Sequence, residues 1–242
     1  MSNSIVIIPT YNEIENIEAI IRAVFDLQKN FHVLVVDDNS PDDTGACVKD
    51  LQQEFTNRLF LETRLEKSGL GTAYIHGFKW AIEKKYDYIF EMDADFSHTP
   101  SDLLRLLKAC ENGADVSVGS RYKKGVNVVN WPLYRVLLSY GASFYVKIIT
   151  GMRVHDPTAG FVCYKRYVLE NIDLDSVRFV GYAFQIEMKF RAYLKNYTIE
   201  EVSIIFRDRE KGKSKMSSSI ISEAIWGVLA MKLRSLFQRN KF

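Results

Sequence analysis

Cysteine is scarce in this chain, whose only three copies are Cys47, Cys110 and Cys163. Their wide spacing excludes the paired cysteines of a zinc knuckle, and their odd number disfavours a disulfide framework. No basic segment with a cleavable apolar stretch precedes the strand-like run that starts at Ser4, so no signal peptide is expected. These features predict a cytosolic protein with reduced thiols.

Long apolar runs are missing as well. The two best candidates, residues 136–146 and 224–231, fall short of the roughly 18 charge-free residues that a membrane-spanning helix needs. Any contact with a membrane is therefore expected to be made from its surface. Glycine and proline, at 13 and 5 of 242 residues, are too few for a low-complexity array, and 47% hydrophobic residues exclude a disordered chain.

Neither sign of charge dominates the composition. The 32 Lys and Arg exceed the 30 Asp and Glu by only two, which disfavours binding of nucleic acid through a global positive charge. The distribution is uneven, because residues 207–241 hold nine Lys or Arg against three Asp or Glu. An anionic partner is therefore expected near the C-terminal end.

Short β-rich runs alternate with segments of helical period in the first half of the chain, a pattern typical of an α/β fold with a mostly parallel sheet flanked by helices. The expected strands are residues 4–8, 32–36, 59–62, 88–92, 116–118 and 198–206. The expected helices are residues 13–27, 42–55, 70–84 and 100–110, followed by amphipathic segments at 133–149 and 220–237. We therefore expect one domain over residues 1–216 and a C-terminal amphipathic helical segment over residues 217–242.

Acidic and polar side chains collect where three of these strands end, in residues 9–13, 37–44 and 93–95. Open α/β sheets bind ligands at the carboxyl ends of their strands. Asn12 or Asp42 alone is explained equally well as a helix cap, but helix capping does not account for the whole set. Crowded carboxylates repel one another unless a cation or hydrogen-bond donors lie among them, so this edge predicts a ligand site.

Asp93-Ala94-Asp95 is the sharpest of these motifs. Two carboxylates one residue apart at a strand end can turn toward one divalent ion, and oxygen ligands favour Mg²⁺ or Mn²⁺ over Zn²⁺. An ion held by two carboxylates keeps open positions that suit the diphosphate oxygens of a nucleotide-sugar donor. Asp93 and Asp95 are therefore the predicted metal ligands.

Two other motifs have simpler interpretations. Gly69-Leu70-Gly71 starts a predicted helix but lacks the third glycine of a dinucleotide-binding loop, so close backbone packing is expected there. Asp37-Asp38 after a strand also occurs in phospho-receiver domains, but those are about half this length and have no second acidic motif like residues 93–95.

A series of short motifs runs along the chain. The motifs are PTYNE at 9–13, VDDNSPDDT at 36–44, GLGTA at 69–73, MDADFSH at 92–98, GSRY at 119–122, Trp131-Pro132 with Arg135 and Ser139, GYAFQIE at 181–187, Asp208-Arg209 and Ser214-Lys215. Taken together, these motifs resemble those of inverting family 2 glycosyltransferases of the GT-A fold, and among them the dolichol-phosphate (polyprenol-phosphate) mannosyltransferases. They cover nearly the whole chain in order. The resemblance implies a GT-A catalytic domain over residues 1–216.

The resemblance also implies roles for individual residues. The residues that would cradle the donor nucleoside are Pro9, Tyr11, Glu13, Val35 and Asp37. Asp93, Ala94 and Asp95 would face the donor diphosphate and its metal ion. Ser97 stands where some members of the family have a Gln that helps to bind the metal, and Gly125-Val126 replaces a frequent Gly-Gly.

Basic residues are implied on the phosphate side of the site. Arg121, Arg209 and Lys215 would lie around the donor and acceptor phosphates, while Arg135 and Ser139 would receive the lipid phosphate. The resemblance assigns catalysis to Asp95, Arg121 and Arg135.

The expected reaction is the transfer of mannose from GDP-mannose to a polyprenyl (dolichyl-type) phosphate, with inversion and with Mg²⁺ or Mn²⁺ as cofactor. A phosphate monoester has a second pKa near 6, so it is already a nucleophile at pH 7 and needs no general base. The same reaction with another donor, such as UDP-glucose, remains an alternative, and so does a non-catalytic regulatory or sugar-binding module.

A lipid acceptor implies a membrane surface as partner. Residues 133–149 and 220–237 combine broad apolar faces with basic residues, as peripheral membrane helices do. A helix packed on the core has the same pattern. We expect a cytoplasmic protein that is peripheral on the cytoplasmic face of a membrane, alone or with a membrane-protein partner.

Overall fold

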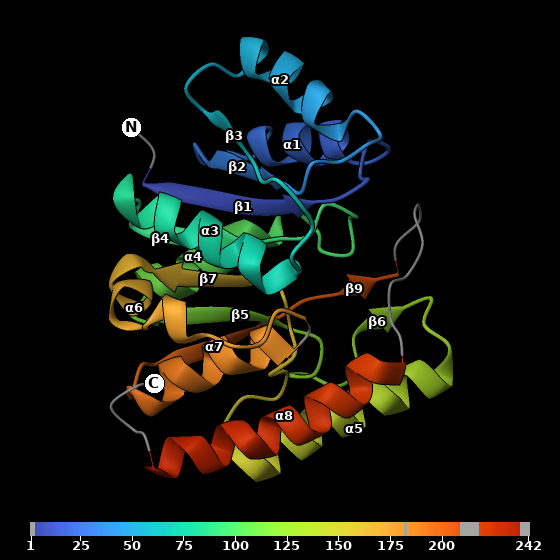
Figure 1. The fold of residues 1–242 in the computed structure, drawn as a ribbon, viewed down its shortest axis with the longest axis vertical. Coiled ribbons are helices and arrows are strands. Elements are labelled where there is room, and N and C mark those ends of the chain that lie inside the picture. Colours follow the sequence, from blue (N-terminus) through green and yellow to red (C-terminus); the bar gives the residue numbers. More distant parts are fainter. Residues whose placement is uncertain (1–2, 182, 209–217, 238–242) are drawn as a thin grey trace.

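The computed structural model describes residues 3–181, 183–208 and 218–237 of the chain. Their centre is a seven-stranded sheet with the strand order β3-β2-β1-β4-β7-β5-β8 (Figure 1). The strands are β1 (Ser4–Thr10), β2 (His32–Asp37), β3 (Leu59–Thr63), β4 (Tyr88–Glu91), β5 (Val116–Ser120), β7 (Val162–Lys165) and β8 (Ile199–Ser203). All neighbours in the sheet are parallel except those of β7, which is antiparallel to β4 and β5. The expected α/β fold class is confirmed.

Helices cover both faces of the sheet. One face packs against α1 (Ile17–Phe25), α2 (Thr44–Glu54) and α4 (Asp102–Glu111). The other packs against α3 (Leu70–Glu83), α6 (Arg166–Asn171) and α7 (Ala183–Leu194). Successive residues of a strand point to opposite faces, so Val33 and Val35 join the first core while Leu34 and Val36 join the second. This explains why the central strands are apolar at nearly every position.

Two helices form a further layer beyond α7. These are α5 (Leu133–Thr150) and α8 (Ser218–Phe237), which lie side by side along the bottom of Figure 1. The Tyr145 hydroxyl donates to the Ile225 carbonyl at 2.8 Å, and Lys232 Nζ donates to the Thr150 carbonyl at 3.2 Å. The two helices therefore run parallel. No helix in the described part of the chain is long and apolar enough to cross a bilayer.

The C-terminal part of the sheet differs from the sequence prediction. The expected strand 198–206 is wrong in extent: β8 ends at Ser203, opposite Ser120, because its partner β5 ends there. The chain continues into a second short strand, β9 (Phe206–Arg207), which pairs with β6 (Val128–Val129) in a separate two-stranded sheet. The predicted boundary at residues 216/217 lies outside the described residues and stays a prediction.

β7 and α7 were not predicted. β7 has only four residues, too few to show a period. In α7, side chains that normally mark a solvent-exposed face are almost completely buried, namely Gln185, Glu187, Lys189 and Arg191. The helix therefore has no amphipathic pattern from which it could be recognised.

The start of α3 packs closely on the segment before α7, as the glycines at 69–71 predicted. Gly69 has φ of 102°, which disfavours any other residue. A Cβ on Gly71 would lie 2.7 Å from the Phe179 carbonyl oxygen, and the Gly71 amide donates to the Val180 carbonyl at 2.8 Å. These glycines bring two backbones together rather than binding a ligand.

A buried ion pair on α7 fixes the same segment. Arg191 donates to Glu187 Oε1 from Nε at 3.0 Å and from Nη2 at 2.7 Å. The exposed fractions of the two side chains are 0% and 1%. Arg191 also reaches Ser176, while Glu187 accepts the backbone N–H groups of Arg178 and Phe179 at 3.0 and 3.1 Å. The loop that leads into α7 is thus bound to the helix by hydrogen bonds to these two charged side chains.

Arg191→Leu is expected to lower the free energy of unfolding by about 3–5 kcal/mol, because the Glu187 carboxylate is left buried without its guanidinium partner. Urea denaturation followed by circular dichroism measures the loss. Arg22→Leu, which removes an exposed guanidinium paired with Glu18 and Glu54, is the control and should cost much less. Equal losses in the two variants would contradict the role given to the buried pair.

Candidate active site

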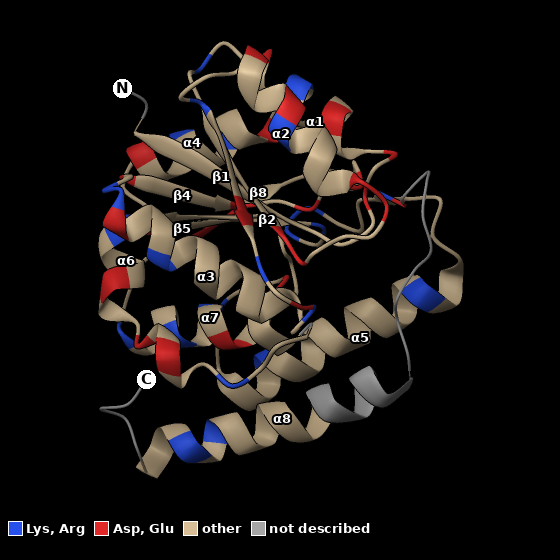
Figure 2. Cartoon of the chain, turned by 45° about the horizontal axis from the view of Figure 1, so that its top comes forward, with Lys and Arg blue, Asp and Glu red and all other residues tan. Residues whose placement is uncertain are grey.

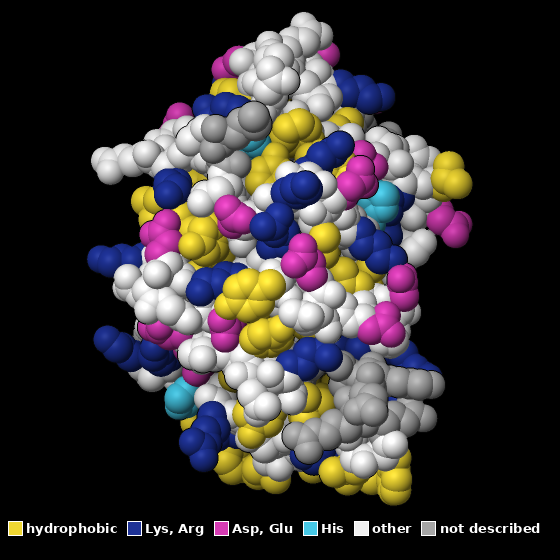
Figure 3. Space-filling view, turned by 90° about the vertical axis from the view of Figure 1, so that its left-hand side faces the viewer, with side chains coloured by type: hydrophobic (Ala, Val, Ile, Leu, Met, Phe, Trp, Pro, Cys, Tyr) yellow, Lys and Arg dark blue, Asp and Glu magenta, His cyan; other side chains and the backbone are white. Residues whose placement is uncertain are grey.

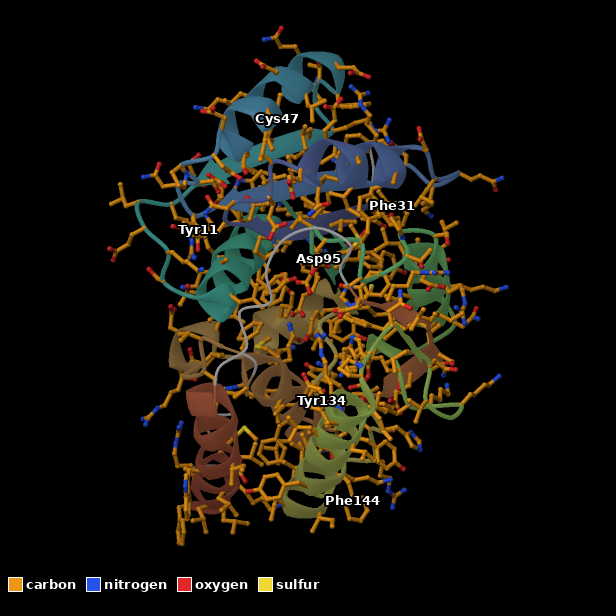
Figure 4. All side chains as sticks on the ribbon, turned by 90° about the vertical axis from the view of Figure 1, so that its right-hand side faces the viewer. Tyr11, Phe31, Cys47, Asp95, Tyr134 and Phe144 are labelled. Carbon is orange, nitrogen blue, oxygen red and sulfur yellow. The ribbon has the colours of Figure 1, made fainter. Side chains whose placement is uncertain are left out.

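A cavity of about 540 Å³ opens at the carboxyl edge of the sheet. One end is lined by Asp93 and Asp95 after β4, and the other by apolar residues of α5 together with Ile225 of α8. Figure 4 shows Asp95 in the middle of the molecule, between Tyr11 on one side and Tyr134 of α5 on the other. The cavity therefore joins the acidic strand end to the two-helix layer.

The carboxylates after β4 are held by the chain around them. The Ser97 backbone N–H donates to Asp95 Oδ1 at 3.0 Å, and Phe96 between them has φ of 58°, a left-handed turn that brings the two residues together. The Tyr74 hydroxyl lies 3.4 Å from Asp93 Oδ1. Burial raises the pKa of Tyr74 well above its ordinary value, so its hydroxyl stays a donor. Asp95 is 8% exposed, and Asp93 is half-buried.

The donor set fits a hard divalent ion that shares its coordination with substrate. Among the described residues, no group of three or more His, Cys, Asp or Glu side chains is placed to hold a metal, so Asp93 and Asp95 would need ligands from elsewhere. Two polar atoms beside them, Ser97 Oγ and His98 Nδ1, are buried and have no hydrogen-bond partner in the described part of the protein. Diphosphate oxygens would complete such a site.

His98 is enclosed by aromatic rings. It stacks on Phe161 with ring centroids 4.8 Å apart and meets the edge of Phe206 at 5.3 Å. Burial lowers the pKa of His98 to about 4, against a smaller opposite effect of the Asp95 charge. The imidazole is therefore neutral at pH 7.

The residues expected around the nucleoside lie at the neighbouring strand ends. Because Ile7 pairs with Glu91 and Thr10 with Asp37, the chain after β1 runs between the ends of β4 and β2. Pro9, Tyr11 and Glu13 are half-buried there. Lys67 Nζ lies 4.3 Å from the centre of the Tyr11 ring.

Asp37 is fixed by hydroxyl groups. It accepts hydrogen bonds from Thr10 Oγ1 at 2.7 Å and from Ser40 Oγ at 2.6 Å. Asp42 ties the same loop together by accepting from Thr44 Oγ1 at 2.6 Å and from the Ile14 N–H at 3.2 Å. Burial opposes ionisation of Asp42, but these hydrogen bonds outweigh it and lower its pKa.

Val35 has no exposed surface and packs in the core beneath this edge. Its side chain supports the strand end in this structure rather than lining the cavity. The sequence analysis missed Arg64, which forms two hydrogen bonds with Asp38 at 2.6 and 2.8 Å and donates to Thr72 Oγ1 at 2.8 Å. This arginine joins the ends of β2 and β3 to the start of α3.

Arg121 lies on the opposite side of the cavity in a buried ion pair. Its Nε and Nη2 donate to the two carboxylate oxygens of Asp156 at 2.7 and 2.6 Å, and its backbone N–H donates to the same group at 3.0 Å. Burial alone would raise the pKa of Asp156, but the Arg121 charge and hydrogen bonds hold it below its ordinary value. Glu201 on β8 in turn accepts the backbone N–H groups of His155 and Asp156 at 2.9 and 3.0 Å.

The start of α5 brings the other acceptor-side residues into the cavity. Arg135 lies 4.1 Å above the Trp131 ring and donates to Asp208 at 2.9 Å. Ser139 accepts a hydrogen bond from the Tyr122 hydroxyl at 2.8 Å. Arg121, Arg135 and Ser139 therefore line one cavity with Asp93 and Asp95. Arg209 and Lys215 lie outside the described residues.

Asp156, Glu201 and Trp131 were given no role from the sequence. Asp156 and Glu201 are isolated acidic residues with no recognisable motif. Asp156 reaches Arg121 from the segment before β7, and Glu201 reaches that segment from β8, because β7 and β8 lie on the two sides of β5. Trp131 belonged to a recognised motif, but its stacking with arginine depends on the tertiary structure.

The low pKa of His98 predicts a pH-dependent loss of stability. Its folded pKa of about 4 lies below the ordinary value of 6.5, so between these values the unfolded chain binds a proton that the folded chain does not. Stability is therefore lost as the pH falls through this window. From pH 7.5 to 4.5, the wild type should lose about 2–3 kcal/mol more than a His98→Phe variant.

Urea unfolding of both proteins across this pH range gives the difference directly. Its value above pH 7 should stay constant and serves as the internal reference. A difference that does not change with pH would contradict a depressed pKa at His98.

Known proteins match this chain along nearly its full length. The family described as glycosyl transferase family 2 matches residues 5–173. A polyprenol monophosphomannose synthase of Mycolicibacterium smegmatis is 45% identical over 98% of this chain and 90% of the relative. An undecaprenyl-phosphate mannosyltransferase of Micrococcus luteus is 44% identical, with 93% of each chain covered.

Solved structures share the fold at low identity. A glucosyl-3-phosphoglycerate synthase from Mycobacterium tuberculosis, in complex with Mn²⁺, UDP and glucosyl-3-phosphoglycerate, gives a TM-score of 0.67 at 17% identity over 96% of this chain and 79% of that one. A mannosyltransferase from Pyrobaculum calidifontis, in complex with GDP-Man and Mn²⁺, gives 0.60 at 16% identity over 98% and 64%. The expected GT-A fold and family resemblance are confirmed. The chain belongs to glycosyl transferase family 2.

Proposed function

We propose that this glycosyltransferase moves mannose from GDP-mannose to the phosphate of a polyprenyl lipid, with inversion at the anomeric carbon. The observation that carries the proposal is the single cavity that joins a pair of carboxylates to an apolar groove. The relatives named as polyprenol- and undecaprenyl-phosphate mannosyltransferases support the substrate pair. A sugar nucleotide and a lipid phosphate need these two environments side by side.

The donor would bind at the acidic end. Pro9, Tyr11, Glu13 and Asp37 surround the expected position of the nucleoside, and Asp93 and Asp95 would hold Mg²⁺ or Mn²⁺ against the diphosphate. When bound, the ion neutralises charge on the departing diphosphate. The residues of the chain orient the donor so that its anomeric carbon faces the other half of the cavity.

The acceptor would bind along α5. Arg135 and Ser139 lie one helical turn apart and face the cavity with Arg121, so they would hold the phosphate head. The groove continues past Leu138, Ala142 and Val146 toward Ile225, which suits an isoprenoid chain. The phosphate oxygen itself attacks the anomeric carbon as GDP leaves, and the ionised phosphate needs no general base.

The test is a panel of nucleotide sugars with a short polyprenyl phosphate and Mg²⁺ or Mn²⁺. We expect polyprenyl phosphate mannose to form from GDP-mannose. Product from UDP-glucose alone would support the alternative donor, and no turnover with any nucleotide sugar would support a binding module instead.

Asp95→Ala is expected to lower kcat/KM by at least a hundredfold, because it removes one of two anionic metal ligands from the diphosphate site. The same assay in excess EDTA should show no wild-type activity. Asp50→Ala, at an exposed position of α2, is the matched control and should keep full activity. Full activity of the wild type in EDTA would rule out metal dependence.

We further propose that α5 and α8 rest on the cytoplasmic face of a membrane. Of the 18 residues of α5, only Arg135 and Lys147 are charged, and Figure 2 shows this nearly uncharged helix beside α8. Among the side chains of these helices that the structure describes, the large exposed apolar ones are Leu133, Tyr134, Leu137, Leu138, Tyr140, Phe144, Ile148, Ile225, Trp226, Leu233, Leu236 and Phe237. Figure 3 shows hydrophobic side chains along the lower edge of the molecule, where these helices lie.

Such a concentration of exposed apolar residues is typical of an interaction surface. A lipid surface is the partner that also presents the acceptor to the cavity between these helices. The alternative is that these helices pack on the protein core. It holds for the inner faces of α5 and α8, where Val146, Val228 and Met231 are buried.

The double variant Phe144→Gln, Ile148→Gln should abolish flotation of the protein with anionic liposomes, since these side chains are 60% and 63% exposed on α5. Neither residue lines the cavity, so activity toward a short, water-soluble polyprenyl phosphate should be kept. Leu65→Gln, which replaces a 95% exposed leucine in the loop between β3 and α3, is the control. Flotation of the double variant equal to wild type would contradict attachment through α5.

A further inference from the structure

Polar side chains project from two opposite sides of α7. Glu187 and Arg191 bind the loop before the helix. Gln185 and Lys189, one turn apart, face the ends of β4 and β7 instead. Gln185 is 2% exposed and Lys189 is completely buried.

Lys189 fixes the orientation of the Gln185 amide. Its Nζ donates to the Ala159 carbonyl at 2.6 Å, to the Gln185 carbonyl at 3.1 Å and to Gln185 Oε1 at 3.2 Å. A lysine ammonium has three N–H donors and no acceptor, so the amide must turn its oxygen toward Lys189.

The nitrogen of the same amide therefore faces Glu91. Gln185 Nε2 donates to Glu91 Oε2 at 2.6 Å. A primary amide carries two N–H donors, and the second has no acceptor among the described residues. The amide is thus held from both ends, by the Lys189 ammonium and the Glu91 carboxyl group, and keeps one N–H available.

This amide lies in the wall of the active-site cavity. Gln185, Ala159 and Gly160 line it together with Asp93. Gly160 contributes no side chain, and a Cβ there would lie 3.7 Å from Gln185 Nε2, in van der Waals contact with the amide nitrogen. The absence of a side chain at position 160 therefore leaves the amide nitrogen open on this side.

The surroundings favour a neutral oxygen as its partner. Asp93 lines the same cavity as the amide, so a phosphate placed against the amide would meet the negative charge of this carboxylate. The arginines that suit phosphate, Arg121 and Arg135, line the same cavity together with α5. A sugar hydroxyl next to the diphosphate site meets no such repulsion.

We propose that Gln185 recognises one hydroxyl of the donor hexose by donating a hydrogen bond from its available N–H. Lys189 and Glu91 are positioning residues that fix the amide for this contact. The inference rests on the proposed function, since it names the sugar-recognising residue of that same site. A fixed donor discriminates against a sugar that lacks its partner hydroxyl, because the buried N–H is then left without an acceptor.

The experiment compares GDP-mannose with the four GDP-deoxymannoses that lack the hydroxyl at C2, C3, C4 or C6. Wild type should lose about tenfold in kcat/KM with one of them through this contact. Gln185→Met should lower kcat/KM for GDP-mannose by a similar factor and should abolish the discrimination at that one carbon. Affinity for GDP, which carries no sugar, should stay at the wild-type value in calorimetry.

Gly160→Ala provides a second test that leaves the network of Lys189, Gln185 and Glu91 unaltered, so it serves even if Gln185→Met does not fold. The added methyl group should cover the amide and reduce the same discrimination. Gln53→Met, at an exposed position of α2, is the matched control and should behave as wild type.

The outcomes separate this inference from the proposed function. Unchanged discrimination in both variants, with a wild type that forms polyprenyl phosphate mannose, overturns the role of Gln185 and leaves the function standing. A wild type that accepts only another nucleotide sugar contradicts the GDP-mannose proposal, and the deoxy series of that sugar then tests Gln185. A wild type that turns over no nucleotide sugar contradicts both.

Discussion

Repulsion among carboxylates at one edge of the sheet is the constraint on which the rest of the site depends. Parallel strands that end together bring Asp37, Asp38, Asp93 and Asp95 to this edge. The chain offsets this repulsion locally: hydroxyl groups bind Asp37, and Arg64 binds Asp38. Each of these contacts also fixes a loop, so the groups that stabilise the carboxylates determine the shape of this edge of the sheet.

Burial of charge organises the opposite side in the same way. Asp156 holds Arg121, and Glu201 holds the backbone that carries Asp156. Inside α7, Lys189 and Arg191 are completely buried because each finds acceptors on a different part of the chain. Such pairs are costly to desolvate, and breaking one leaves an uncompensated charge. They fix the walls of the cavity because a displaced partner would leave the other buried charge without its hydrogen bonds.

The layer of α5 and α8 has both a buried and an exposed apolar face. α5 buries Val146 against α7 and α8, yet leaves Tyr134, Phe144 and Ile148 exposed. An exposed apolar face of this size is typical of an interaction surface, and lipid is the partner proposed for it. Arg135 and Ser139 lie on the cavity side of this helix, so one rigid element would make both proposed contacts, with the lipid and with the acceptor phosphate.

The sequence by itself determined the first half of the fold, because its buried strands and amphipathic helices have clear periods. It also determined the acidic motif 93–95, because neighbouring residues at a strand end stay together in space. It also identified the family, since the motifs are local and ordered. The tertiary structure alone decided that β7 runs antiparallel, that β8 ends at Ser203, that Val35 is enclosed, and that Asp156 pairs with Arg121. These features depend on contacts between residues far apart in the chain. In the sequence, a buried lysine such as Lys189 cannot be told from a solvent-exposed one, because its acceptors come together only in the folded chain.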